Sequence, residues 1–402
     1  MKKFVSVLLT GLMALSMTAC SGNKDGGSSD APASGSATAQ PAEEAAAEVT
    51  VAMITDYGDI TDQSFNQTTY EAAKAYCDAN GLKFNYFKPA GDSTAERVAM
   101  IDKAVADGYN TLVMPGYAFA GAIAETVDMY PDVKFIALDV SEFDLTDAGL
   151  KAIPENLFSA VYQEEIAGYF AGQAAVKLGY EKLGFLGGMA VPAVIRYGYG
   201  FVQGANDAAA ELGKKVEINY AYGNQFFGDA DITAAMDTWY GAGTEVVFAC
   251  GGGIFTSAAD AAKKVNAKVI GVDVDQAANI DAYAQSEGMT VTSAMKGLAP
   301  TVNTLLAAVK DGGWAEFGGQ IQNLGLVSGS DPSLNYVGLP ASTQWADGFT
   351  EADYNKLVAD VFSGAVTVSG DSADEAYQAL SGTDSVTVES DNAVVNYQGN
   401  IK

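Results

Sequence analysis

The sequence predicts an α/β protein of two lobes, each holding a parallel sheet flanked by helices. Of its 402 residues, 49% are apolar and 44 are glycine, a composition typical of a compact chain. Runs rich in Val, Ile, Phe and Tyr alternate with helical segments of about 10–15 residues, which indicates βαβ units. The alternation restarts after a helix expected over 164–177. Two sheets are therefore expected rather than one.

The strands of the two sheets are expected on either side of that helix. The first set is predicted at 49–55, 82–88, 111–116, 133–140 and 158–163. The second set is predicted at 182–188, 216–223, 244–253 and 267–275. Three later strands, able to complete either lobe, are predicted at 289–296, 323–329 and 334–340.

The N-terminus reads MKKFVSVLLTGLMALSMTAC and resembles a bacterial lipoprotein signal over residues 1–19. Two lysines precede an apolar run that is too short to span a bilayer, and small residues precede Cys20. The resemblance implies that Cys20 is lipidated and becomes the first residue of the mature chain. The alternative is an ordinary secretory signal in which Cys20 has no special role.

Residues 20–48 are expected to form a lipidated cysteine followed by a flexible tether. Positions 21–48 contain no aromatic and no large aliphatic side chain, so they cannot bury enough surface to fold. A tether of this kind reaches about 30 Å. It would hold a globular body near a membrane without spanning it.

Composition excludes several classes of function. The formal net charge of -28 repels phosphate backbones and anionic lipids, so no nucleic-acid partner is expected. The chain has no histidine, which removes Ser-His-Asp, Cys-His and His-metal chemistry. Neither a membrane-spanning segment nor a phosphate-binding loop is found in the sequence. The sequence therefore predicts a binding protein without cofactor rather than an enzyme or a transporter.

Cys77 and Cys250 are the remaining cysteines. Cys77 lies in a helical pattern and Cys250 at the end of a strand, so both are expected as small buried side chains. A disulfide between them stays open as an alternative.

Polar residues and glycines follow many of the predicted strands. In open α/β sheets, ligands bind beyond the carboxyl ends of the strands. One aspartate after a strand is usually a turn or a helix cap. Several such residues at the ends of two facing sheets favour a cleft. They are Asp56, Gly116, Tyr117, Asp139, Gly252, Gly253, Asp273 and Lys296.

The segment 53–67, MITDYGDITDQSFNQ, joins the first strand to the first helix. Asp62 or Ser64 is expected to cap this helix, with Gln67 completing a capping box. Phe65 lies in the first turn, where its ring would point back toward the strand ends.

The acidic residues of this segment also raise the alternative of a calcium loop. Asp56, Asp59 and Asp62 stand at odd positions of such a loop, but its twelfth position is Gln67 rather than glutamate. No metal site is therefore predicted.

Together with later segments, this motif resembles the basic-membrane-protein family of substrate-binding lipoproteins, whose characterised members bind purine nucleosides for uptake. The resemblance covers about residues 50–370. The other segments that carry it are LGFLGGMAVPAVIRYGYGFVQGA (183–205), FFGDADITAAM (226–236), VVFACGGG (246–253), VIGVDVDQ (269–276), TSAMK (292–296) and YVGLP (336–340).

The resemblance implies a type I periplasmic-binding-protein fold, with three crossovers between two lobes and a ligand in the cleft. By this resemblance, residues 49–162 with 290–325 form one lobe and residues 163–289 with 326–370 form the other. Residues 371–402 lie beyond the family pattern, and their role is unknown. Within them, VTVES and AVVNYQ are able to form a hairpin.

By the same resemblance, one group of residues would hold the base of a nucleoside. Phe65 and Phe227 would stack on its two faces, and stacking on an aromatic ring contributes about 1–3 kcal/mol per base. Phe226 is the neighbouring alternative to Phe227. Asp139 or Asn66 would read the polar edge of the base.

A second group would hold the sugar. Asp56 and Asp273 would accept hydrogen bonds from ribose hydroxyls, and Lys296 would donate to ribose oxygens. Gly252 and Gly253 would let the backbone approach the sugar closely.

The resemblance therefore implies a lipid-anchored receptor that binds a nucleoside, with a purine favoured, and delivers it to the permease of an ABC-type importer. The expected location is the extracytoplasmic face of the cell membrane, and the expected state is a monomer. The alternative is a receptor for a sugar or another small polar ligand on the same fold. More arginines would favour that alternative, but the chain has only Arg97 and Arg196.

Overall fold

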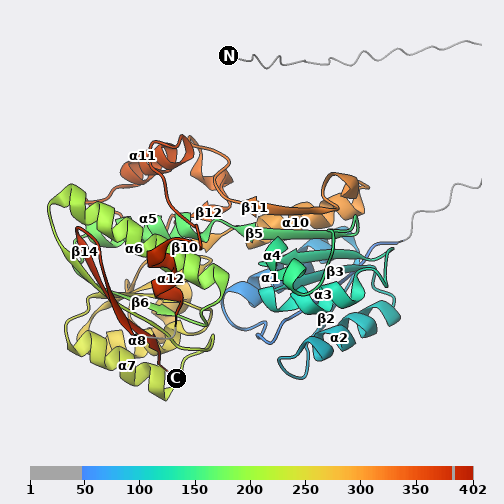
Figure 1. Ribbon diagram of the computed structural model, residues 1–402, viewed down its shortest axis with the longest axis horizontal. Coiled ribbons are helices and arrows are strands. Elements are labelled where there is room, and N and C mark those ends of the chain that lie inside the picture. Colours follow the sequence, from blue (N-terminus) through green and yellow to red (C-terminus); the bar gives the residue numbers. More distant parts are fainter. Residues whose placement is uncertain (1–47, 383–384, 402) are drawn as a thin grey trace, which may run out of the picture. The chain divides into compact units, whose positions relative to one another are not determined.

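The computed structural model describes residues 48–382 and 385–401. The predicted signal peptide, Cys20 and nearly all of the predicted tether lie outside these residues. Within them, the strands form two sheets, of six and eight strands, which lie on either side of the crossovers (Figure 1). The predicted α/β class with two parallel sheets is confirmed.

The first sheet is parallel throughout, in the order β11-β5-β4-β3-β1-β2. Its strands are β1 (Thr50–Ile54), β2 (Lys83–Phe87), β3 (Thr111–Pro115), β4 (Lys134–Leu138), β5 (Leu157–Tyr162) and β11 (Gln320–Leu324). The helices of this lobe are α1 (Phe65–Asn80), α2 (Thr94–Ala106), η1 (Tyr117–Phe119), α3 (Ala120–Thr126), α4 (Glu142–Asp147), α10 (Leu298–Lys310) and η2 (Trp314–Glu316).

Strand β1 shows why the strands of this sheet are apolar at successive positions in the sequence. Val51 and Met53 belong to one hydrophobic cluster, whereas Ala52 and Ile54 belong to another on the opposite face. Successive side chains of a strand point to opposite faces, so helices on both sides bury all four.

The second sheet has the order β12-β10-β9-β8-β6-β7-β14-β13, with antiparallel strands only at its two edges. Its strands are β6 (Lys182–Gly187), β7 (Val216–Tyr222), β8 (Val246–Cys250), β9 (Lys268–Asp273), β10 (Thr290–Lys296), β12 (Val337–Gly338), β13 (Val386–Glu389) and β14 (Ala393–Asn400). The helices of this lobe and the last crossover are α5 (Glu164–Lys177), α6 (Pro192–Leu212), α7 (Ala230–Gly241), α8 (Phe255–Val265), α9 (Ala277–Ala284), η3 (Pro332–Leu334), α11 (Glu351–Phe362) and α12 (Glu375–Ser381).

Helices α5 and α6 pack backbone against backbone. A Cβ atom added at Gly168 would lie 2.1 Å from the carbonyl oxygen of Tyr197, and one added at Gly200 would lie 1.9 Å from that of Glu165. Only glycine permits such an approach. This close packing brings the first turn of α5 beside Arg196 of α6.

Three crossovers join the lobes, and hydrogen bonds hold them side by side. The Gln163 N–H donates to the carbonyl of Leu324, and the Gly297 N–H donates to that of Tyr336. The prediction that the strand at 290–296 belongs to the first lobe is wrong. It pairs with β9 as the next βα unit of the second sheet, and the chain crosses only at Gly297.

Two late strands also differ from their predicted positions. The strand predicted at 323–329 is β11 at Gln320–Leu324, because Gly325 already belongs to the crossover. The strand predicted at 334–340 is reduced to Val337–Gly338.

The C-terminal segment completes the second sheet. The predicted hairpin is confirmed, because β13 pairs with β14 in antiparallel register, and β14 also pairs with β7 in parallel. The Tyr222 hydroxyl donates to the carbonyl of Leu380, and Trp239 Nε1 donates to Gln398. Residues beyond the predicted family pattern are thus part of the second lobe.

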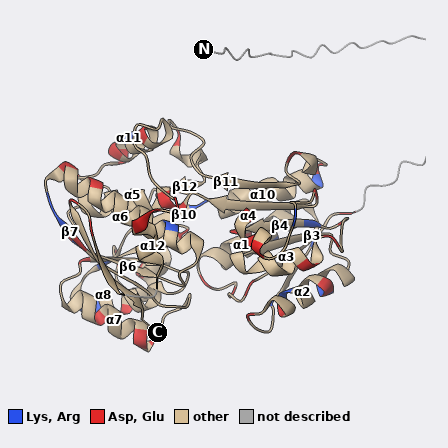
Figure 2. Cartoon of the chain, viewed as in Figure 1, with Lys and Arg blue, Asp and Glu red and all other residues tan. Residues whose placement is uncertain are grey.

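Acidic side chains are spread over the helices with few basic side chains between them, as the net charge of -28 requires (Figure 2). Among residues 48–382 and 385–401, no helix has the length and apolar character needed to cross a membrane.

Candidate ligand-binding site

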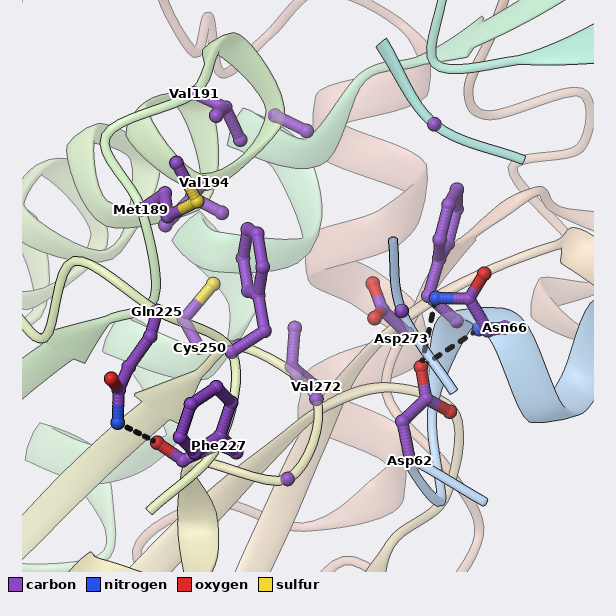
Figure 3. A pocket seen from close by; sticks show the side chains of 18 of the residues that line it. Asp62, Asn66, Met189, Val191, Val194, Gln225, Phe227, Cys250, Val272 and Asp273 are labelled. Atoms are coloured by element: carbon purple, nitrogen blue, oxygen red, sulfur yellow. Dashed lines mark hydrogen bonds between the residues drawn. The ribbon is translucent and has the colours of Figure 1, made fainter. Parts of the chain in front are cut away.

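A cavity of about 680 Å³ lies where the carboxyl ends of strands from both sheets face each other. Its volume falls in the range of about 300–1,000 Å³ that is common for small-molecule sites. Apolar side chains that include Met189, Val191 and Val194 line one side, while Asp62, Asn66 and Asp273 lie on the other (Figure 3).

All nine residues predicted to bind ligand line this one cavity. They are Asp56, Phe65, Asn66, Asp139, Phe227, Gly252, Gly253, Asp273 and Lys296. The structure thus brings together residues that lie up to 240 positions apart in the chain.

Lys296, at the end of β10, is the centre of a buried cluster of charges. Its Nζ lies 2.6 Å from Asp139, 3.4 Å from Glu164 and 3.7 Å from Asp273. Burial alone lowers the pKa of Lys296, but these carboxylates outweigh it and the pKa is raised. Lys296 therefore stays charged, and its Nζ also lies 4.6 Å from the ring centroid of Phe65.

Sequence reasoning missed Glu164 and Glu165 as members of this cluster. Arg196 Nε lies 2.7 Å from Glu164 and 3.9 Å from Glu165. Burial raises the pKa of Glu165 to about 7. The available signal was two adjacent glutamates at the start of an otherwise apolar helix. Two acids in a first turn are also what the helix dipole favours, so the pattern was not specific.

Asp56 and Asp139 are buried carboxylates on the first lobe. Burial raises the pKa of each to about 6, although backbone N–H groups of Gly58 and Tyr57 oppose the shift at Asp56 and Lys296 opposes it at Asp139. Asp56 accepts those two bonds at 2.7 and 2.6 Å. Burial thus disfavours the charged form of both groups.

The start of α1 differs from the predicted capping box. The carboxylate of Asp62 caps the helix, because it accepts from the N–H groups of Ser64, Asn66 and Gln67 at 2.9–3.0 Å. The Ser64 side chain makes no cap bond and instead donates to Asp273 Oδ2 of the other lobe at 2.7 Å. An interaction between lobes has replaced a local one.

The Oδ1 atoms of Asn66 and Asp139 are buried and have no hydrogen-bond partner among the described residues. Asn66 Nδ2 is occupied, since it donates to Asp62 at 3.2 Å (Figure 3). A buried acceptor without a donor is costly to maintain. Both oxygens are buried from solvent in this structure.

Four non-glycine residues that line the cavity have left-handed backbone conformations, with φ between 56° and 66°: Gln63, Asp139, Asn224 and Asp273. Asn and Asp tolerate this region better than other residues do, yet it remains uncommon. Such residues gather where the surrounding structure fixes the direction of a side chain.

The aromatic residues of the cavity fall into two groups. Phe227 lines the cavity with 61% of its surface exposed. Its neighbour Phe226 stacks on Tyr57 of the other lobe at a centroid distance of 6.2 Å. Sequence reasoning did not single out Tyr57 as a site residue.

Gly252 has a φ of 55°, and a Cβ atom added there would lie 3.4 Å from the Phe226 carbonyl oxygen and 3.8 Å from Asp62 Cβ. The latter belongs to the other lobe, so this glycine lies where the two lobes approach closely.

Cys77 and Cys250 are buried free thiols, as predicted, and Cys250 lines the cavity (Figure 3).

The aspartates of the possible calcium loop are engaged separately. Asp59 pairs with Lys88 at 2.8 Å, while Asp56 and Asp62 accept backbone N–H groups. Within the part of the chain that the structure describes, no three side chains of His, Cys, Asp or Glu gather as metal ligands.

Two parallel α/β lobes, three crossovers and a cavity between the strand ends define the type I periplasmic-binding-protein fold. The likeness to solved structures shows the same fold. A solute-binding protein of an ABC transporter system from Aeropyrum pernix aligns with a TM-score of 0.64 at 19% identity, covering 82% of this chain and 95% of that one.

The chain belongs to the family described as ABC transporter substrate-binding protein PnrA-like, whose profile matches residues 49–330. The predicted basic-membrane-protein family is thereby confirmed, and this is a family of non-catalytic substrate-binding proteins.

Two relatives illustrate the family. The ABC transporter nucleoside-binding protein BmpA of Lactococcus lactis is 30% identical over 69% of this chain and 79% of its own length. An uncharacterised lipoprotein of Pyrococcus horikoshii is 27% identical over 76% of this chain and 72% of its own.

Proposed function

We propose that this protein is a lipid-anchored nucleoside receptor, with purine nucleosides favoured, that delivers its ligand to the permease of an ABC importer. The observation that carries the proposal is one cavity that combines an exposed aromatic ring, Phe227, with buried carboxylates and one buried lysine. A nucleoside has an aromatic base for the first feature and a hydroxylated sugar for the second. The relative from Lactococcus lactis is also named for nucleoside binding.

In this proposal Phe65 and Phe227 hold the base by stacking. Asp139 or Asn66, which both line the cavity, would read the polar edge of the base. A carboxylate or amide oxygen there would accept from amino or N–H groups of the base.

The sugar is held by Asp56, Asp273 and Lys296, with Gly252 and Gly253 leaving room for it. Asp273 already accepts from Ser64, so the carboxylate is oriented before a ribose hydroxyl arrives. Preorganisation of this kind improves affinity because less freedom is lost on binding.

Membrane attachment is proposed through acyl chains on Cys20, followed by the tether up to residue 48. Replacing Cys20 with Ser should move the protein from the membrane fraction to the medium, because no acyl chain then holds it. Unchanged fractionation of a correctly processed Cys20→Ser protein would contradict the anchor while leaving ligand binding open to test.

The ligand class is tested by thermal unfolding with adenosine, guanosine, inosine, uridine, ribose and galactose. A ligand that binds only the folded form stabilises it by about 2.7 kcal/mol at a hundred times its dissociation constant. Nucleosides should raise the transition temperature. A shift with ribose or galactose, and none with nucleosides, would favour the sugar receptor instead.

The division of labour is tested by calorimetry on Asp273→Ala with a ribonucleoside and with its 2′- and 3′-deoxy forms. Leaving a ribose hydroxyl unpaired in a buried site costs about 1–3 kcal/mol. The loss should largely vanish for the deoxynucleoside that lacks the hydroxyl bound by Asp273. An equal loss for all three ligands would remove Asp273 from the ribose site.

A further inference from the structure

Tyr57 follows β1 of the first lobe, yet its side chain contacts the second lobe. Its ring lies 6.2 Å from the Phe226 ring, centroid to centroid, with 27° between the planes. Its hydroxyl donates to the sulfur of Met189 at 3.2 Å. All three side chains line the cavity. The contact therefore closes one side of the site from both lobes at once.

The first lobe holds Tyr57 in place. The guanidinium carbon of Arg97 lies 5.9 Å from the Tyr57 ring centroid, and the side chain of Tyr117 interacts with the Tyr57 hydroxyl. Arg97 is itself only 3% exposed and is paired with Asp92. The ring is thus presented to the second lobe from a fixed support.

Phe226 is held just as firmly on the other lobe. A Cβ atom added at Gly188 would lie 2.3 Å from the Phe226 ring, and one added at Gly251 would lie 3.2 Å from it. The Phe226 ring therefore packs directly against the backbone at Gly188 and Gly251. In contrast, the adjacent Phe227 is 61% exposed. Of the two neighbouring rings, one is committed to the other lobe and the other remains available to a ligand.

We propose that Tyr57 and Phe226, with Met189, form an aromatic latch that holds the lobes together over the ligand and sets how long the ligand stays bound. These contacts join separate lobes, so they exist only while the lobes are together. Breaking them belongs to opening, and their loss should act mainly on the dissociation rate. Tyr57 is then a positioning residue for closure. The ligand arm of the test rests on the proposed function.

The latch is tested first without ligand, on the full-length protein purified in detergent. Nitroxides attached through ketone-bearing unnatural amino acids at positions 103 and 264, exposed on α2 and α8, report the distance between lobes by pulsed electron resonance. Tyr57→Leu and Phe226→Leu should each shift the distribution toward longer distances. Tyr57→Phe, which keeps the ring contact and loses only the bond to Met189, should shift it less than Tyr57→Leu does.

Tyr86→Leu is the matched control. Tyr86 also forms an aromatic pair, with Tyr70 at 5.7 Å, but both rings belong to the first lobe. This variant loses one ring pair without loss of an interlobe contact, so its distance distribution should equal that of the unsubstituted protein. A shift as large as that of Tyr57→Leu would overturn the proposal, because general loosening would then explain both.

The ligand arm measures dissociation of tritiated adenosine, guanosine and inosine. Because an aromatic pair stabilises the contact between the lobes, Tyr57→Leu should raise the dissociation rate about two- to tenfold. The association rate should change much less. The Tyr57→Leu, Phe226→Leu double variant should be little worse than Tyr57→Leu alone, since that variant already loses both the ring contact and the bond to Met189.

The outcomes separate the two proposals. Unchanged distances and unchanged dissociation in both Tyr57→Leu and Phe226→Leu would overturn the latch. A shifted distance distribution in a protein that binds none of the three nucleosides would support the latch and contradict the nucleoside function.

Discussion

The two sides of the cavity differ in how many of their side chains already have partners within the protein. On the charged side, Lys296 contacts three carboxylates, and Asp273 accepts from Ser64. On the apolar side, Phe227 is largely exposed. The charged side therefore contributes to folding as well as to the site, whereas Phe227 is available to a ligand without a role in the core. Substitutions on the two sides should separate stability from binding.

The largest expected effect is on the charged side. Lys296→Met leaves Asp139 and Asp273 buried without their cation, whereas Glu164 keeps Arg196, and removing one partner of a buried pair costs about 3–5 kcal/mol. Urea unfolding should show this loss. The control is Lys264→Met, which removes an exposed pair with Asp237 and should cost less than about 1 kcal/mol. Equal losses would contradict the importance of burial.

A smaller effect, with a distinctive pH dependence, is expected at Glu165. Its pKa is raised from an ordinary 4.5 to about 7, so the folded protein binds a proton that the unfolded chain releases. Stability should therefore fall as pH rises from about 4.5 through 7. Glu165→Gln removes this penalty and should raise the free energy of unfolding by about 1–3 kcal/mol at pH 8, but hardly at pH 4.5.

Unfolding measured at both pH values checks this prediction, with Glu125→Gln on the exposed face of α3 as the control of equal charge change. A gain that is the same at pH 4.5 and pH 8 would show that titration of Glu165 is not its source. Asp56 and Asp139, whose pKa values are raised to about 6, should leave a residual slope of the same sign in the variant.

On the apolar side, Phe227→Ala should affect binding alone. The ring is 61% exposed, so the free energy of unfolding should change by less than about 0.5 kcal/mol. Nucleoside affinity should weaken by about 1–3 kcal/mol in calorimetry. Phe143→Ala, an exposed ring that does not line the cavity, should change neither quantity. Normal binding by Phe227→Ala would remove this ring from the site.

The smallest effect is expected at Asp59, a carboxylate at the edge of the charged side. Its pair with Lys88 is exposed on both partners, and such pairs contribute about 0–1 kcal/mol. Lys88→Met, which leaves the two hydrogen bonds from Thr61 to Asp59 in place, should therefore lower stability only slightly at low salt and not measurably at high salt. A loss comparable with that of Lys296→Met would break the distinction between buried and exposed charge.

The fold and the polar residues at the strand ends were largely predictable from sequence because both depend on local patterns, whereas the stacking roles of Phe65 and Phe227 were expected only from the family resemblance. Continuous apolar runs such as 49–55 reflect burial on both faces of a strand, and β1 shows that burial. Parallel strands place their carboxyl ends at one edge of the sheet. The gathering of Asp56, Asp139, Asp273 and Lys296 in one cavity could therefore be predicted without knowing how side chains pack.

The errors share one cause, which is that the relevant partner lies far away in the chain. Asp62 or Ser64 was expected to cap α1, and Asp62 does so, but the capping box at Ser64 is absent because the Ser64 hydroxyl bonds to Asp273, 209 residues away. The strand at 290–296 was assigned to the wrong lobe because the local sequence shows that it is a strand but does not show that it pairs with β9. Glu164 resembled an ordinary first-turn acid until Arg196 and Lys296 surrounded it.

Residue type and spacing were enough to predict the alternation of strands and helices, the polar residues at strand ends and the family. They could not predict which charges pair, which oxygens of Asn66 and Asp139 have no hydrogen-bond partner, or which of two adjacent rings contacts Tyr57. The physical reason is that pairing depends on distance and burial, and both arise only when two lobes that fold from separate parts of the chain approach each other.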